Sequence, residues 1–312
     1  MSLSVAVIGE CMLELTHADR ASQGIARPMN MSYGGDSINT SIYLSRSGVA
    51  VSYVTALGDD ATSDWLLKQW QGEGVDCSLV DRMANSVPGM YMVNVADDGE
   101  RSFLYWRKNS PASRMFDDQD RAVQHFAKIA DYDYLYLSGI SLAILGSESR
   151  ERVMRLLERY RQNGGKIIFD GNYRPKLWSN AEQAQNAYIQ MYKLTDIALP
   201  TVDDEIELFG YSSAEQVMQA VKDCGVTEIV VKMGGDGCLA LSDGVVSNVA
   251  AEVVEPVDTT AAGDSFNAGY IASRLGGASN VEACSAGHDL ASKVIQHPGA
   301  IIPAESMDLA KV

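Results

Sequence analysis

Short apolar runs alternate with longer amphipathic stretches along most of the chain. The apolar runs have the length of buried strands, and the stretches between them carry apolar residues at helical spacing. This alternation predicts an α/β fold in which helices cover both faces of a mostly parallel sheet. The predicted strands are residues 5–8, 51–56, 134–137, 166–169, 197–199 and 229–232. The predicted helices are residues 37–47, 64–71, 150–162, 203–208, 215–223, 264–275 and 281–296.

One segment departs from this alternation. Residues 90–96 and 101–107 flank an Asp-Asp-Gly sequence at 97–99 and predict a β-hairpin. A hairpin inside an α/β chain indicates an excursion from the main sheet, as a flap over a site or as a contact between two copies. No Pro- or Ser-rich linker, low-complexity tract or internal repeat divides the sequence. We therefore expect a single domain over residues 1–312 with a small β appendage.

The composition argues against several classes of protein. The 312 residues include 25 Lys and Arg against 41 Asp and Glu, and the resulting net charge of −16 disfavours nucleic acid and anionic membrane as partners. No apolar run approaches the roughly 20 residues that span a bilayer, and no basic segment precedes the first apolar run as in a signal peptide. The five cysteines include no C-x-x-C pair, which favours reduced thiols. We expect a soluble, cytoplasmic protein.

The segment with the clearest chemistry is Asp-Thr-Thr-Ala-Ala-Gly-Asp at residues 258–264, directly before an apolar helix. Its small side chains allow an anion to approach the backbone. Its N–H groups can converge with those of the helix N-terminus to form an anion hole. The carboxylate of Asp264, in the first turn, is either a helix cap or a base aimed at a nucleophile beside the anion, and in isolation the cap is favoured.

Two glycine segments are weaker signals. The Gly-Gly pair at 34–35 permits a ligand to approach the backbone closely, but paired glycines also mark ordinary turns. The Gly-Gly-Asp-Gly sequence at 234–237 follows a predicted strand and either wraps a nucleotide or forms a plain hairpin. The sequence lacks a P-loop, a G-x-S-x-G motif, an H-E-x-x-H motif and a complete G-x-G-x-x-G after the first strand. A P-loop protein is therefore excluded and a dinucleotide-binding protein disfavoured.

Together these three segments resemble the PfkB, or ribokinase-like, family of carbohydrate kinases. Residues 34–39 match the family's Gly-Gly…Asn signature, and residues 258–264 match its D-T-T-G-A-G-D signature. The resemblance implies a ribokinase-like three-layer α/β/α sandwich with a small β-sheet lid formed by about residues 11–33 and 88–110. It also implies ATP, Mg²⁺ and a monovalent cation such as K⁺ as ligands, and a homodimer through the lid or a higher homo-oligomer.

Two positions depart from the family pattern. Ala261 stands where the family has glycine, and its methyl group should narrow the anion hole slightly without removing an N–H donor. The segment 200–205 lacks the Asn of the family's Asn-x-x-Glu, which helps to organise magnesium-bound water. The acidic role is therefore assigned to Glu205, with Asp204 as the alternative.

Within the family, the chain is most similar to the 2-keto-3-deoxygluconate kinases. The A-A-G-D variant and the hairpin sequence at 103–107 occur in that subgroup, whereas the segment 170–178 is shared with fructokinases. The resemblance implies ATP-dependent phosphorylation of 2-dehydro-3-deoxy-D-gluconate at its 6-hydroxyl. The carboxylate of such a small sugar acid suits guanidinium groups. The alternatives are a fructokinase or another kinase of neutral sugars, a non-catalytic sugar-binding relative and, from the α/β pattern alone, a dehydrogenase.

The resemblance also assigns roles to individual residues. Asp264 is the expected general base. The expected anion hole consists of the N–H groups of Ala261, Ala262 and Gly263. The residues expected to contact the sugar acid are Gly34, Gly35, Asp36, Ser37, Ile38, Tyr91, Tyr105, Arg107, Arg174 and Asp264. The residues expected to line the nucleotide cleft are Asn172, Lys232, Gly234, Gly235, Gly237 and those of the anion hole. Asp258 is the candidate for the monovalent cation, and Glu205 for magnesium through a water molecule.

Overall fold

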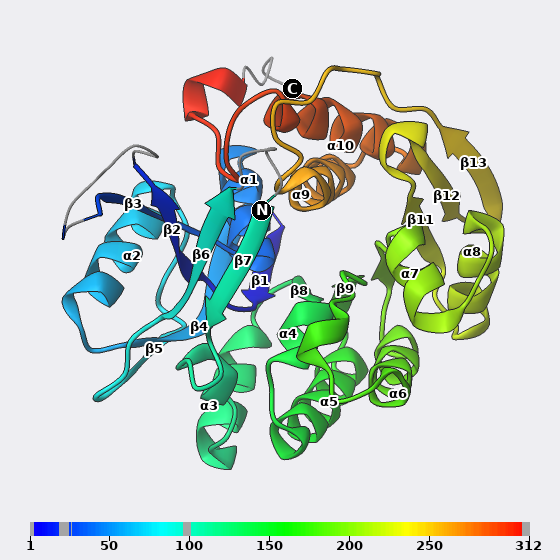
Figure 1. Cartoon of the computed structure of the whole chain (residues 1–312). Coiled ribbons are helices and arrows are strands. Elements are labelled where there is room, and N and C mark those ends of the chain that lie inside the picture. Colours follow the sequence, from blue (N-terminus) through cyan, green and yellow to red (C-terminus); the bar gives the residue numbers. More distant parts are fainter. Residues whose placement is uncertain (1–2, 19–24, 26, 96–100, 308–312) are drawn as a thin grey trace.

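The computed structural model describes residues 3–18, 25, 27–95 and 101–307 (Figure 1). Within them, the main sheet has nine strands in the order β13-β12-β11-β10-β9-β8-β1-β4-β5. Neighbouring strands from β11 to β5 are parallel, and β12 and β13 are antiparallel at one edge. The strands are β1 (Ser4–Ile8), β4 (Ala50–Gly58), β5 (Val80–Met83), β8 (Tyr134–Ser138), β9 (Lys166–Asp170), β10 (Ile197–Ala198), β11 (Glu228–Lys232), β12 (Cys238–Ser242) and β13 (Val245–Val249).

Helices cover both faces of this sheet (Figure 1). They are α1 (Asp36–Arg46), α2 (Ala61–Gly72), α3 (Gln119–Ile129), α4 (Gly139–Ala143), α5 (Ser147–Gln162), α6 (Ala181–Tyr192), α7 (Val202–Phe209), α8 (Ala214–Asp223), α9 (Ala262–Leu275) and α10 (Asn280–Ile295). Short 3₁₀ turns occupy Ala112–Arg114, Pro175–Leu177, Gly234–Asp236 and Ala304–Met307. The apolar sides of α3, α5, α6 and α8 form one core cluster, and those of α1, α2, α9 and α10 form the other. The predicted three-layer sandwich is confirmed.

The strands form where the sequence provides continuous apolar runs. In β9, Ile167, Ile168 and Phe169 are completely buried, because helices pack on both sides of a parallel sheet. Every predicted strand and helix is present, with ends within three residues of those expected. The predicted elements did not include α3 or α6. In α6, Ala and Tyr fill most of the buried positions, whereas α3 does bury residues at regular helical spacing.

A second sheet has the strand order β3-β2-β6-β7. The strands β2 (Met12–His17) and β3 (Met29–Gly34) are antiparallel, and β2 runs parallel to β6 (Gly89–Val95). The antiparallel pair of β6 and β7 (Arg101–Trp106) confirms the predicted hairpin, whose turn at 97–99 lies outside the described residues. We call these four strands the lid sheet.

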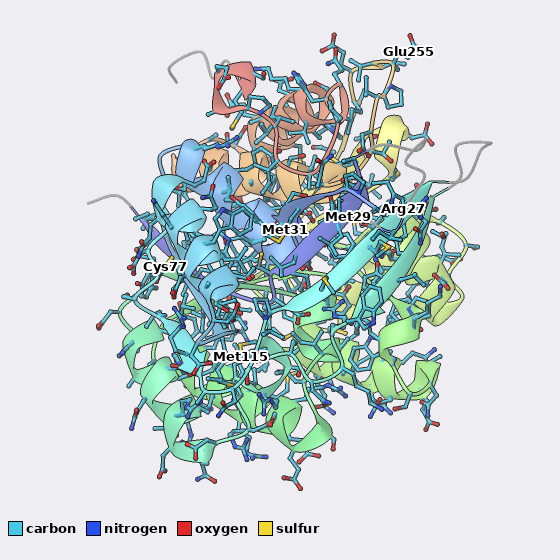
Figure 2. The ribbon with its side chains drawn as sticks, turned by 60° about the vertical axis from the view of Figure 1, so that its left-hand side comes forward. Arg27, Met29, Met31, Cys77, Met115 and Glu255 are labelled. Atoms are coloured by element: carbon cyan, nitrogen blue, oxygen red, sulfur yellow. The ribbon has the colours of Figure 1, made fainter. Side chains whose placement is uncertain are left out.

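The lid sheet has two different faces. On one face, the rings of Tyr91, Phe103 and Tyr105 pack together with centroid separations of 5.8 to 6.4 Å. The opposite face exposes apolar side chains, among them Met31 at 48% and Leu104 at 50% exposure, and Figure 2 shows Met31 on β3. The lid sheet therefore presents apolar surface in two directions.

Two glycines bring α9 and α10 into close contact. A Cβ atom on Gly269 would lie 2.7 Å from the carbonyl oxygen of Ala286, and one on Gly287 would lie 2.9 Å from the ring of Phe266. These distances leave no room for a methyl group at either position. The contact fixes α9, whose N-terminus carries the Ala-Ala-Gly-Asp sequence, against the rest of the main sheet's helical layer.

Replacing Gly269 by Ala is expected to lower the free energy of unfolding by about 1–3 kcal/mol, because the added methyl group must push α10 away. Gly72→Ala is the control, since Gly72 also lies in a helix but nothing surrounds its Cβ position within 4 Å. The control should leave stability unchanged or raise it by up to about 1 kcal/mol. Urea unfolding followed by circular dichroism measures both, and equal effects would contradict the close contact.

Candidate active site

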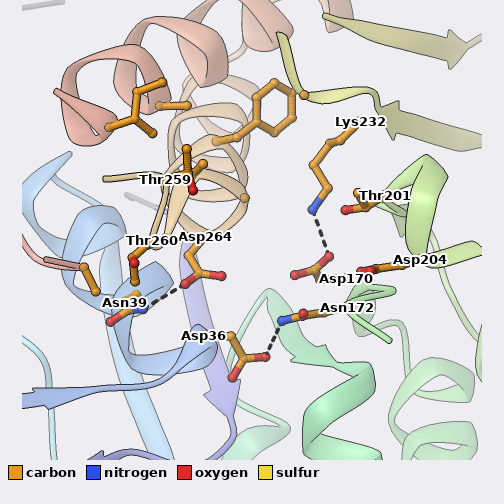
Figure 3. Close-up of a pocket in the computed structure, with 18 of the residues that line it drawn as sticks. Asp36, Asn39, Asp170, Asn172, Thr201, Asp204, Lys232, Thr259, Thr260 and Asp264 are labelled. Atoms are coloured by element: carbon orange, nitrogen blue, oxygen red, sulfur yellow. Dashed lines mark hydrogen bonds and ion pairs between the residues drawn. The ribbon is translucent and has the colours of Figure 1, made fainter. Parts of the chain in front are cut away.

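A cavity of about 730 Å³ lies at the carboxyl ends of the parallel strands, where α/β sheets bind ligands. Asp170 at the end of β9 and Lys232 at the end of β11 line it, together with the first turn of α9. The aromatic face of the lid sheet closes another side through Tyr91, Phe103 and Tyr105. Figure 3 shows polar side chains from several elements pointing into this space.

The start of α9 provides backbone donors to the cavity. Ala261, Ala262, Gly263 and Asp264 all line it. The N-cap residue Ala261 has the left-handed angles φ 61° and ψ 17°, a region that favours glycine and costs an alanine about 1–2 kcal/mol. This conformation gives a physical reason for the family's glycine at the position, beyond the narrowing expected from the methyl group. The first-turn N–H groups and the helix dipole favour an anion at this point.

Asp264 does not cap α9. The cap position belongs to Ala261, without a side-chain capping hydrogen bond, and the Asp264 carboxylate instead accepts a hydrogen bond of 2.8 Å from Nδ2 of Asn39 on α1. Burial, and then the negative charge of Asp36, raise the pKa of Asp264 to about 8. The cap interpretation is therefore wrong. The carboxylate instead lies beside the donors of α9, where a base would stand.

Asp36 begins α1 on the other side of the same space. Its carboxylate accepts a hydrogen bond of 3.0 Å from Nδ2 of Asn172, which follows β9 (Figure 3). Burial is the main cause that raises the pKa of Asp36. Gly35 precedes it at φ 153°, and a Cβ there would lie 2.4 Å from the carbonyl oxygen of Glu10. The glycine therefore lets the start of α1 approach the strand end.

A buried ion pair crosses the floor of the cavity. Nζ of Lys232 lies 2.9 Å from Oδ1 of Asp170 and 3.0 Å from Oδ1 of Asn267. The two ionic side chains are 9% and 3% exposed. An ion pair with so little water contact is held by geometry and by additional hydrogen bonds, here the one that Lys232 donates to Oδ1 of Asn267.

Arg174 and Asp204 form a second pair at the edge of the cavity, with 3.1 Å between Nη1 and Oδ1. Burial raises the pKa of Asp204, and the charge of Arg174 opposes that rise. The neighbouring Glu205 does not line the cavity. It is 1% exposed, and it accepts a hydrogen bond from the hydroxyl of Tyr192 behind α7. Of the two acidic candidates, Asp204 lines the cavity and Glu205 does not, and the role itself stays a prediction.

Arg107 is not among the residues that line the cavity. It follows β7, and its guanidinium forms an ion pair with the buried carboxylate of Glu10, which also accepts a hydrogen bond from Ser110. Because Glu10 is 2% exposed, it needs a cationic partner, and Arg107 supplies it. In this arrangement the guanidinium of Arg107 contacts Glu10, and its expected contact with a sugar acid stays a prediction.

The other expected residues divide into two groups. Those that line the cavity are Gly35, Asp36, Tyr91, Tyr105, Asn172, Arg174, Lys232, Gly234, Gly235, Gly237, Ala261, Ala262, Gly263 and Asp264. Those that do not are Gly34, Ser37, Ile38, Arg107, Glu205 and Asp258. Ser37 bonds to the Tyr53 hydroxyl at 2.8 Å and Ile38 belongs to the core, because both point to the inner side of α1. Asp258 instead accepts hydrogen bonds of 3.0 Å from the backbone N–H groups of Thr260 and Gly299.

Several lining residues were not expected from the sequence. They are Asn39, Asp170, Thr201, Thr259 and Thr260. Asp170 carried a usable signal, since it ends a predicted buried strand at the edge where ligands bind. Asn39 carried a weaker one, as the last residue of the Gly-Gly…Asn segment. The partners of both lie far away in the chain.

A family model described as pfkB family carbohydrate kinase matches residues 2–307. The chain belongs to the PfkB family of carbohydrate kinases. A 2-dehydro-3-deoxygluconokinase of Escherichia coli (strain K12) is 46% identical over 315 residues, which cover 98% of this chain and 99% of that protein. A protein of the same name from Dickeya dadantii (strain 3937) is 44% identical over 312 residues, covering 97% and 98%. This PfkB chain is thus similar over nearly its full length to two proteins that are both named 2-dehydro-3-deoxygluconokinase.

Solved structures show the same fold at lower identity. A 2-dehydro-3-deoxygluconokinase from Thermotoga maritima has a TM-score of 0.85 at 20% identity and covers 99% of each chain. A protein described as a ribokinase II from E. coli, in complex with ATP and Mg²⁺, has a TM-score of 0.83 at 24% identity, covering 98% and 96%. A double mutant of Vibrio cholerae fructokinase with fructose, ADP and potassium has a TM-score of 0.79 at 21% identity, covering 96% and 94%. The fold of this PfkB kinase is therefore ribokinase-like, as expected.

Two features are absent from the described part of the chain. No helix there has the length and apolarity of a membrane span. In the same residues, no group of three or more His, Cys, Asp or Glu side chains is arranged to hold a metal ion.

The raised pKa of Asp264 predicts a specific dependence of stability on pH. Between about pH 4 and 8 the folded protein keeps a proton on Asp264 that the unfolded chain releases, so this group makes stability fall as pH rises. Asp264→Asn removes that slope, which is up to about 1.4 kcal/mol per pH unit for one proton. We expect the variant's Tm to exceed that of the unchanged protein by a margin that grows from pH 4 to pH 8.

Asp60→Asn is the matched control. Burial raises the pKa of Asp60, but hydrogen bonds from Ser63 and Thr62 at the start of α2 outweigh it and lower the pKa. This carboxylate therefore stabilises the fold above its unfolded pKa, and its loss should lower Tm slightly at neutral pH. A margin for Asp264→Asn that stays constant across the pH range would show that Asp264 is ionised in the folded protein.

Proposed function

We propose that the chain transfers the γ-phosphoryl group of ATP to the 6-hydroxyl of 2-dehydro-3-deoxy-D-gluconate. The observation that carries the proposal is the position of the Asp264 carboxylate, which lies in one cavity with the donors of α9 and the guanidinium of Arg174. A base, an anion hole and a cation for a carboxylate are the parts that this reaction needs. The full-length relatives named 2-dehydro-3-deoxygluconokinase support the same acceptor.

Asp264 acts as the general base. Its carboxylate takes the proton of the acceptor hydroxyl as that oxygen attacks the γ-phosphorus. A pKa of about 8 suits this role, because a base works best when its pKa lies near the working pH. The N–H groups of Ala261, Ala262 and Gly263 stabilise charge on the transferred phosphoryl group. Asn39 holds the carboxylate in place through its 2.8 Å hydrogen bond.

The residues of the cavity fit a nucleotide with its metal ion. Gly234 and Gly235 line the cavity and have open space around their Cβ positions, which leaves room for a ligand against the backbone. Mg²⁺ bound with ATP neutralises phosphate charge, taking most of its oxygen ligands from phosphate and water. Asp204, which faces the cavity, would orient one of those waters. Asp258 remains our candidate for a monovalent cation such as K⁺.

The lid completes the proposal. Tyr91 and Tyr105 would cover the sugar acid and exclude water, which otherwise competes as the phosphoryl acceptor. The opposite apolar face of the lid sheet, which includes Met31 and Leu104, would pair with the lid of a second copy and form a homodimer or part of a higher homo-oligomer. We expect the kinase to work in the cytoplasm, where ATP is available.

The first activity test compares acceptors. A coupled ADP-release assay with 2-dehydro-3-deoxy-D-gluconate, fructose, ribose and adenosine should give the highest kcat/KM for the sugar acid. Asp264→Asn should lower kcat about 10²–10⁴-fold, because it removes the proton acceptor and keeps the anion hole. Its raised thermal stability serves as the control for folding. Near-complete activity in this variant, or a preference for fructose, would contradict the base or the acceptor respectively.

The second activity test concerns the carboxylate. Arg174→Ala should lower kcat/KM for the sugar acid about 10–100-fold, since a charge-assisted hydrogen bond contributes about 1.5–3 kcal/mol. The same variant should affect fructose much less. Arg155→Ala is the control, because Arg155 is 63% exposed on α5 and pairs with Glu151 outside the cavity. An equal loss for both acceptors would make Arg174 a structural residue.

A further inference from the structure

The ammonium group of Lys232 occupies a junction of three elements. Lys232 is the last residue of β11. Its Nζ lies 2.9 Å from Oδ1 of Asp170 at the end of β9 and 3.0 Å from Oδ1 of Asn267 on the second turn of α9. Figure 3 shows its side chain extended toward the centre of the cavity, with the dashed line to Asp170. Both contacts are buried, so the position of Nζ is fixed from two directions.

The same ammonium group lies against the anion hole. A Cβ atom on Gly263 would be 3.7 Å from Nζ of Lys232, and Gly263 stands one helical turn before Asn267 on the same side of α9. A lysine ammonium has three N–H donors. Two of these donors are used by the carboxylate of Asp170 and the amide oxygen of Asn267, and Lys232 also lines the cavity. The third donor is therefore available to a ligand oxygen at the start of α9.

The balance of charge at this point is strongly negative. The carboxylates of Asp36, Asp170 and Asp264 converge on it, and the phosphates of a nucleotide would add to them. Among the described residues, the cavity is lined by one lysine, Lys232, and one arginine, Arg174, and Arg174 pairs with Asp204 away from α9. Lys232 is thus the fixed positive charge nearest to the anion hole.

We infer that Lys232 is a catalytic residue, which donates its third N–H to an oxygen of the phosphoryl group during transfer. The inference rests on the proposed phosphoryl transfer and not on the identity of the sugar. Asp170 and Asn267 are positioning residues, because they hold the ammonium and do not touch the phosphoryl group. A second effect follows from the same geometry: the charge of Lys232 lowers the pKa of Asp264, opposing the effects of burial, Asp36 and Asp170, while Asn39 lowers it as well.

The transfer step balances with these groups. The acceptor oxygen forms a new bond to the γ-phosphorus, and its proton passes to the carboxylate of Asp264. The bond between the γ-phosphorus and the β–γ bridging oxygen breaks, and its electron pair leaves on ADP. Lys232 keeps all its protons throughout, and its role is to stabilise charge on the phosphoryl oxygens.

A purely structural role would predict something different. Lys232 would then serve only to neutralise the buried carboxylate of Asp170, and removing both charges together would restore function. Three variants separate these roles: Lys232→Met, which removes the charge at similar length, the double variant Asp170→Asn/Lys232→Met, which also removes its partner, and Lys232→Arg. Lys166→Met is the control, because Lys166 begins β9 at the opposite end of the sheet and its ammonium lies 5.5 Å from the Tyr134 ring centre.

The experiment measures kcat and KM for ATP from pH 6 to pH 9, with the acceptor that the unchanged enzyme uses best. We expect kcat to fall about 10²–10³-fold in Lys232→Met and in the double variant, with a smaller change in KM for ATP. In Lys232→Met the acidic limb of the kcat profile should also move to higher pH, because Asp264 loses a nearby cation. Lys232→Arg should recover part of the loss, and Lys166→Met should match the unchanged enzyme.

The double variant decides the inference even where Lys232→Met is poorly folded, since it leaves no buried charge without a partner. Recovery of kcat in the double variant would overturn the catalytic role, and so would a loss that appears only in KM for ATP. If the enzyme prefers fructose, the proposed acceptor is wrong but the inference about Lys232 can still be tested. The lysine variants are compared with the acceptor that the unchanged enzyme uses best. A maintained loss of kcat in the double variant supports the inference.

Discussion

Three carboxylates lie close together near the start of α9, those of Asp170 and Asp264 buried and that of Asp36 partly buried, and the surrounding residues hold them there. Each has a polar partner from a different part of the chain: Asn39 for Asp264, Asn172 for Asp36, and Lys232 for Asp170. An unpaired buried carboxylate would be strongly destabilising, so each of these contacts is needed. The same contacts tie α1, α9, β9 and β11 to one another. The site and the packing of the carboxyl end of the sheet are therefore one structure.

The architecture could be predicted from the sequence because most of the strands and helices of the main sheet carry their own signal. A buried parallel strand such as β9 is a continuous apolar run, and a β-hairpin is marked by alternation around a turn. Asp264 could be found for a similar reason, since it follows a run of small residues that leads into an apolar helix. These signals are local in sequence. They depend on no contact with a distant segment.

The rest of the site could not be predicted, because it depends on such contacts. Arg107 pairs with Glu10, which lies 97 positions earlier in the chain. No local sequence pattern around Arg107 indicates that its partner is a buried carboxylate so far away. Asp204 and Glu205 are neighbours on α7, but side chains one residue apart point about 100° away from each other on a helix. The orientation of α7 against the sheet decides which of the two faces the cavity. That orientation is set by tertiary packing.

The buried carboxylates also explain why the cations of the cavity matter. Burial and Asp36 already raise the pKa of Asp264 to about 8, and a bound nucleotide would bring further negative charge close to it. The value of about 8 already includes the opposing charge of Lys232, so without that charge the pKa of Asp264 would be higher still and the carboxyl group would release its proton less readily. A metal ion bound with the nucleotide compensates part of the added negative charge. Lys232 is already in place before any ligand arrives, because Asp170 and Asn267 hold its ammonium next to α9. The ion pair that neutralises one carboxylate therefore also sets the conditions under which the other can act as a base.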